Sequence, residues 1–138
     1  DLGTLGGKES MAYAINNAGQ VVGWAEMADG KAHAFLWQDG RMTDLGSVEP
    51  YLSVAEAISD TGLVVGLIED EQYRKSAVAW TKGELSELRT LRGRQTEADG
   101  VNASDQIVGV TKDAKGYWHA ALWEPKPTGA IERSRKGA

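Results

Sequence analysis

The sequence predicts an all-β protein made of three four-stranded antiparallel repeats of 43 residues. Two observations carry this prediction. Written in rows of 43, the chain aligns with itself three times without an insertion, and a tryptophan returns at the same place in each row. Each row also holds short apolar runs separated by turn residues, a spacing typical of consecutive strands. We therefore expect units at residues 1–43, 44–86 and 87–123, followed by an irregular basic tail at 124–138.

The first unit is predicted to contain four strands, at residues 11–16, 20–26, 32–38 and 41–46. Asn17-Ala18-Gly19 follows the first strand, and its glycine suits the left-handed position of a type I turn with a G1 bulge. In the third unit Asp105 takes this place, and aspartate tolerates a positive φ better than most residues. Asp39-Gly40 is a strong signal for a two-residue hairpin turn between the last two strands.

Tryptophans and mid-strand glycines recur in register. Gly19-Gln20-Val21-Val22-Gly23 returns as Gly62-Leu63-Val64-Val65-Gly66, and His33-Ala34-Phe35-Leu36-Trp37 returns as His119-Ala120-Ala121-Leu122-Trp123. A glycine inside a strand weakens it unless another backbone or a large ring lies close by, so we expect such a neighbour at each glycine. The predicted structural positions are Trp37, Trp80, Trp123, Gly23, Gly66 and Gly109.

These segments resemble the HAF repeat family, a group of bacterial repeats described as extracellular. Its pattern is similar to Asp1-Leu2-Gly3-Thr4-Leu5-Gly6-Gly7, then the Gly-Gln-Val-Val-Gly segment, then His33-Ala34-Phe35-Leu36-Trp37. The second unit departs from it at Glu49-Pro50-Tyr51 and has Ser76 in place of the histidine. The resemblance covers residues 1–123 and implies an extracellular or cell-surface location, although the chain begins without a signal peptide. No activity comes with the family.

A four-stranded unit of 43 residues has the size of a β-propeller blade, and propellers close with about 4–8 blades. Three blades leave the ring open. The chain is therefore expected to be half of a six-bladed ring completed by a homodimer, or a fragment of a longer propeller; a β-trefoil is the alternative. We favour the homodimer, in which residues 1–5 of one chain supply the fourth strand that Glu124-Pro125-Lys126-Pro127 interrupts in the other.

Composition and charge exclude several classes of site and ligand. The absence of cysteine excludes disulfides, Cys-ligated metals and thiol nucleophiles. A net charge of −5 argues against nucleic acid, and the lack of an apolar run of about 20 residues argues against membrane insertion. The units carry −2, −5 and, with the tail, +2, which favours contact between the acidic middle of one molecule and the basic end of another. No motif for a metal or cofactor is present, and we expect neither; His33 and His119 are interpreted as a repeat position.

We interpret the chain as a non-catalytic binding or assembly module and expect no enzyme activity. Loops that vary over a constant scaffold are where binding residues are most often found, and aromatic residues there suit a glycan or a protein partner. The candidates are Tyr51, Tyr73, Arg74, Arg92, Arg94, Tyr117 and Trp118. The alternative is a propeller-type hydrolase or lyase that uses the loop carboxylates Glu49, Glu71 and Glu97.

Overall fold

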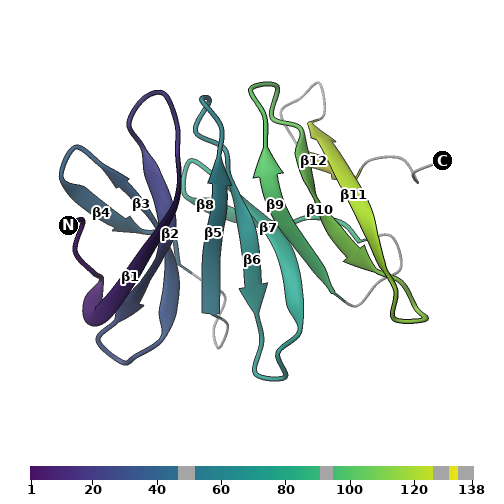
Figure 1. Cartoon of the computed structure of the whole chain (residues 1–138), viewed down its shortest axis with the longest axis horizontal. Helices are drawn as coiled ribbons and strands as arrows, with labels where there is room; N and C mark the ends of the chain where they lie inside the picture. Colours follow the sequence, from purple (N-terminus) through teal and green to yellow (C-terminus); the bar gives the residue numbers. More distant parts are fainter. Residues whose placement is uncertain (47–51, 91–94, 126–130, 134–138) are drawn as a thin grey trace.

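Three four-stranded antiparallel sheets, one for each predicted repeat, make up the fold in the computed structural model (Figure 1). The structure describes residues 1–46, 52–90, 95–125 and 131–133. These residues contain strands, turns and loops, and no helix among them is long and apolar enough to cross a membrane. The predicted all-β class and the three antiparallel sheets are confirmed.

Within each sheet the strands lie side by side in chain order. The first sheet holds β1 (Gly6–Ile15), β2 (Val21–Met27), β3 (Ala32–Gln38) and β4 (Arg41–Asp44). The second holds β5 (Leu52–Ile58), β6 (Val64–Glu69), β7 (Lys75–Thr81) and β8 (Glu84–Glu87). The third holds β9 (Thr96–Val101), β10 (Ile107–Lys112), β11 (Trp118–Pro125) and β12 (Ile131–Arg133).

The turns follow the predicted backbone chemistry. Asp39 and Gly40 have φ of 50° and 83°, the pair of positive values that a type I′ hairpin turn requires. Lys82 and Gly83 repeat these values between β7 and β8. Asp105, in the turn between β9 and β10, has a φ of 58°, so its carboxylate side chain replaces glycine at a left-handed position as expected.

The outer edge of the third sheet corrects one expectation. The prolines after Trp123 were expected to remove the fourth strand, yet β12 pairs with the end of β11, with Trp123 opposite Arg133 and Pro125 opposite Ile131. Pro125 is tolerated because it is the last residue of β11, where the missing N–H interrupts no continuing ladder. Exchange of an N-terminal strand between chains is therefore unnecessary.

The N-terminal segment also differs from its prediction. Residues 1–4 form no strand, and Leu5 makes a single parallel bridge to Met27. The first strand begins earlier than residue 11, because the carboxylate of Glu26 accepts hydrogen bonds from the amides of Lys8 and Glu9 at 3.1 Å each and holds this segment beside β2. Residues 6–10 are thus part of β1 and lie in the first sheet, beside β2 of the same chain.

The three sheets are stacked in a row, and their first strands lie next to one another (Figure 1). β5 packs against β1, β2 and β3, and β9 packs in the same way against β5, β6 and β7. Every pairing among the described strands joins strands of one sheet. A β-trefoil needs strands of all three repeats in one barrel, and the pairings among the described strands do not form such a barrel.

Two apolar cores lie between the sheets. The first is formed by Val22 and Ala34 of the first sheet and by Val64, Val78 and Trp80 of the second. The other side of the second sheet packs on the third to form the second core, whose buried members are Leu63, Val65, Ala77, Ala79, Leu88, Ala98, Ile107 and Trp123. The second sheet is therefore buried on both faces, because it has a neighbouring sheet on each side.

At two repeat positions the residue on an end face is less buried than its equivalents inside the stack, although Phe35, on the same face as Trp37, is only 1% exposed. Trp80 and Trp123 are 1% and 2% exposed, while Trp37, on the outer face of the first sheet, is partly exposed. At the other end, Val108 is 50% exposed, although its equivalents Val22 and Val65 have no exposed surface. The end faces of the stack thus carry core residues without a covering sheet among the described residues.

Candidate functional site

The loops that join the second and third strands of each sheet lie at the same end of the strands, along the lower edge of the row of sheets in Figure 1. We call this the loop end. Tyr73 is 78% exposed and Tyr117 is 66% exposed there, so both rings are available to a ligand. The predicted residues Tyr51, Arg92 and Arg94 lie outside the described residues.

Aspartates shape the loop end. Asp70 Oδ1 accepts the backbone N–H groups of Gln72 and Arg74 at 2.9 and 3.0 Å, and its Oδ2 accepts Nε of Arg74 at 2.7 Å. These hydrogen bonds, with the backbone N–H of Arg74 first, lower the pKa of Asp70. The Arg74 guanidinium is therefore held by its own loop, beside Tyr73, whose φ of 60° turns the backbone sharply.

The equivalent loop of the third sheet is built in the same way. Asp113 Oδ1 accepts the N–H groups of Lys115 and Tyr117 at 2.9 Å each, and its Oδ2 lies 2.8 Å from Nε2 of His119. The hydrogen bond with the His119 side chain is the main cause that lowers the pKa of Asp113. His33 instead lies 3.0 Å from Asp44 through Nδ1. The two histidines thus have separate carboxylate partners in different sheets.

Trp118 belongs to an end face of the stack as well as to the loop end. It is the first residue of β11 and is 45% exposed, with the ammonium of Lys112 5.3 Å from its ring centroid. The register of β10 and β11 puts Trp118, Ala120 and Leu122 on the same face as Val108. The outer face of the third sheet therefore carries the exposed residues Val108, Ala120 and Trp118 beside the partly exposed Leu122 and Lys112.

Each first strand contains a bulge, and its bulged residue was missed by the sequence analysis. The register shifts between Ala12 and Ala14 in β1, between Ala55 and Ala57 in β5, and opposite Val108 and Gly109 in β9. The bulged residues are Tyr13, Glu56 and Asp99, each one repeat apart. In the sequence the small residues continue at every second position through each bulge, so the alternation gave no signal for it.

The repeated mid-strand glycines make room for these bulges. A Cβ atom on Gly23 would lie 1.8 Å from the carbonyl oxygen of Met11, and one on Gly66 would lie 2.0 Å from that of Val54. Gly109 has the same relation to Glu97, at 1.9 Å. The predicted close neighbour of each glycine is therefore a backbone carbonyl of the first strand, not a tryptophan ring.

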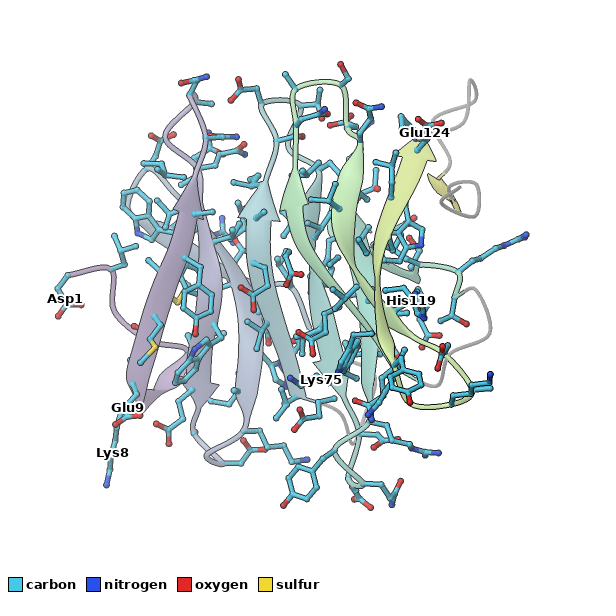
Figure 2. All side chains as sticks on the ribbon, turned by 45° about the vertical axis from the view of Figure 1, so that its right-hand side comes forward. Asp1, Lys8, Glu9, Lys75, His119 and Glu124 are labelled. Atoms are coloured by element: carbon cyan, nitrogen blue, oxygen red, sulfur yellow. The ribbon has the colours of Figure 1, made fainter. Side chains whose placement is uncertain are left out.

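Carboxylates gather along the first strands of the second and third sheets. Lys75 Nζ lies 3.1 Å from Oε1 of Glu97 (Figure 2). Burial raises the pKa of Glu56, and the charges of Asp99 and Glu97 raise it further, while Lys75 lowers it. Burial also raises the pKa of Asp99, with a further contribution from Glu97. Glu97 was predicted; Glu56, Asp99 and Lys75 were not.

Of the other two predicted carboxylates, Glu71 lies exposed in the loop between β6 and β7, and Glu49 lies outside the described residues. Over the described ranges, no group of three or more His, Asp or Glu side chains is arranged to hold a metal ion.

A cavity of about 580 Å³ is lined mainly by residues of the first and second sheets, with Asp105 and Pro125 of the third repeat, at the end opposite the loop end. Leu36, Leu45 and Trp80 form part of its apolar wall, and Thr61 and Lys82 contribute polar groups near the turns. The described candidates Tyr73, Arg74, Tyr117 and Trp118 do not line it. These four residues and the cavity are therefore at different ends of the molecule.

Comparison with known proteins assigns no family or activity. No family model matches the sequence, and no curated protein matches it either. The resemblance to HAF repeats stays a prediction.

Proposed function

We propose that the protein is a non-catalytic binding and assembly module of the β-propeller type, in which each four-stranded sheet is a blade. The observation that carries this proposal is the exposure of one repeat position: Val108 is 50% exposed, whereas Val22 and Val65 are fully buried against the next sheet. An apolar face of this kind is stabilised when a further blade covers it. The proposed role of the two end faces is therefore to receive further blades.

The experiment is a measurement of molar mass by light scattering over a concentration series. Assembly through the end faces is expected to give a mass above 14.8 kDa that rises to a plateau. A mass of 14.8 kDa at every concentration, from micromolar to millimolar chain, would contradict assembly of this chain.

The loop end is proposed as the ligand-binding surface of the module. Tyr73, Tyr117 and Trp118 are exposed aromatic side chains next to polar and charged loop residues. Such rings stack on sugar rings or anchor a protein segment at low entropic cost, because they have few rotatable bonds. The proposed ligand is a glycan or a protein. The HAF resemblance implies an extracellular or cell-surface location, where a glycan ligand would be found.

A hydrolase or lyase is the second candidate, favoured by one observation. Glu97 lies in a group with Glu56 and Asp99, and burial and like charges raise the pKa of the latter two. A carboxyl group with a raised pKa keeps its proton at higher pH and can act as an acid catalyst. Hydrolysis or elimination of a polysaccharide that is lost in both Glu97→Gln and Asp99→Asn would favour the enzyme over the binding module.

A further inference from the structure

The two internal junctions of the stack share one set of backbone contacts. Ser53 Oγ of β5 accepts the N–H of Ala34 in the preceding sheet at 2.8 Å, and Thr96 Oγ1 of β9 accepts the N–H of Ala77 at 2.7 Å. The carbonyl oxygens of the same alanines accept the N–H groups of Leu45 and Leu88, at 2.9 Å each. Leu45 and Leu88 follow β4 and β8 directly, so their hydrogen bonds extend the ladder of the same sheet. The contact that crosses each junction is the N–H of the alanine with a hydroxyl of the next sheet.

The same groups stand at the two ends of the stack. Ala120 is the equivalent of Ala34 and Ala77, and it is exposed on the outer face of the third sheet. Its register with Val110 repeats that of Ala34 with Trp24, so its N–H and C=O point away from β10 as those of Ala34 point away from β2. Within residues 1–46, 52–90, 95–125 and 131–133, the pairing of β12 with β11 extends to Trp123, and none of these residues binds the two groups outside the strand ladder.

The first sheet carries the complementary groups. Ser10 is the equivalent of Ser53, and its hydroxyl donates to the carbonyl oxygen of Gly3 at 2.6 Å, as that of Ser53 donates to Gly46 at 2.9 Å. This hydrogen bond uses the hydroxyl proton and leaves a lone pair to accept another. Leu2 corresponds to Leu45, and the partly exposed Trp37 corresponds to the buried Trp80.

We propose that a second copy of this chain covers both end faces at once, and that Ser10 Oγ of each copy accepts the N–H of Ala120 of the other. This inference rests on the proposed assembly function and names its partner. The third sheet of each copy packs on the first sheet of the other, which gives a closed two-fold ring of six blades. Each junction then repeats the contacts that the chain already makes twice internally.

The closing experiment is a cysteine pair in a chain that has no native cysteine. In the variant Ser10→Cys with Ala120→Cys, oxidation is expected to convert more than half of the protein into a covalent dimer of twice 14.8 kDa. The matched control, Ser10→Cys with Lys82→Cys, places the second thiol on an exposed turn away from the junction and is expected to stay monomeric under denaturing conditions.

A second variant tests the same junction without thiols. Val108→Asp is expected to weaken dimerisation at least 100-fold and to give 14.8 kDa where the parent protein is dimeric. The control Lys82→Asp introduces the same charge on an exposed turn of the second sheet, away from both end faces, and is expected to leave the dimer intact.

The outcomes separate the two proposals. A ladder of covalent trimers and larger species would overturn the closed pair while leaving assembly through the end faces in place. A parent protein that stays at 14.8 kDa and a cysteine pair that gives no covalent dimer would overturn both.

Discussion

Lys75 and Glu97 form an ion pair between the second and third sheets, with 3.1 Å between Nζ and Oε1. The pair lies beside two further carboxylates, Glu56 and Asp99, on the first strands of the same two sheets. Lys75 lowers the pKa of both, but burial and the neighbouring negative charges have the larger effect, so both pKa values are raised. This group of charges therefore makes the stability of the stack depend on pH.

Glu56→Gln is expected to stabilise the protein at neutral pH. A pKa raised in the folded state means that the folded chain binds the proton more tightly than the unfolded chain. The stabilising contribution of Glu56 is therefore complete below its ordinary pKa of 4.5 and is lost as the pH rises through the raised value. Thermal unfolding should give a Tm about 2–4 °C above that of the parent protein at pH 7, with a smaller difference at pH 4.

Glu84→Gln is the control for this measurement, because Glu84 is exposed at the start of β8. Its Tm is expected to follow the parent protein at both pH values. A Glu56→Gln variant that gains as much Tm at pH 4 as at pH 7 would show that burial and like charge do not act on this carboxyl group as inferred.

Gly66→Ala is expected to be strongly destabilising. The added Cβ would lie 2.0 Å from the carbonyl oxygen of Val54, so β5 and β6 would have to move apart at the bulge. We expect a loss of about 3 kcal/mol in the free energy of unfolding, measured by urea denaturation. Gly100→Ala is the control, since its Cβ would meet the side chain of Val108 at 3.2 Å, and an exposed side chain can rotate away.

Trp123→Phe is expected to destabilise the protein more than Trp80→Phe. Trp123 Nε1 donates to the carbonyl oxygen of Arg89 at 2.8 Å, whereas Trp80 Nε1 is buried without a partner among the described residues. Both substitutions remove similar volume from equivalent core positions, but the first also removes a hydrogen bond of about 1 kcal/mol. Equal urea midpoints for the two variants would contradict this assignment of the Arg89 contact.

Tyr73→Ala and Tyr117→Ala are expected to reduce ligand binding at least tenfold if the loop end is the binding surface. The measurement is a glycan array followed by titration of any sugar that binds. Lys82→Ala changes an exposed turn at the opposite end and should leave binding unchanged. An array without a bound sugar would argue against the glycan and leave a protein segment as the candidate ligand.

The strand pattern of the fold was predictable from the sequence because its signals are local. The period of 43 residues, the Asp39-Gly40 turn and the left-handed Asp105 each depend on neighbours in the chain. The fourth strand of the third sheet was not predictable, because Ile131–Arg133 lies beyond two prolines and carries little alternation of its own. Its pairing is a tertiary contact that local propensity does not encode.

The candidate site was predictable only in part, for the same reason. Tyr73 and Tyr117 stand out because they interrupt the repeat, and both are exposed as expected. Glu56 and Asp99 sit at bulges in otherwise regular strands, and their proximity to Glu97 and Lys75 depends on how the second and third sheets stack. A sequence row shows the repeat position of these residues but not the neighbour from the next sheet.

The hydroxyl contact of Ser53 with Ala34 has a consequence for how such a chain grows. Each 43-residue unit carries an alanine whose N–H donates to the unit after it, and a hydroxyl that accepts an N–H from the unit before it. Duplication of one unit in the gene therefore copies both halves of the joint together, and the new neighbour fits without further substitution. Chains of different length can arise in this way with the same joint throughout, so that the number of units, rather than the chemistry between them, is what evolution has to select.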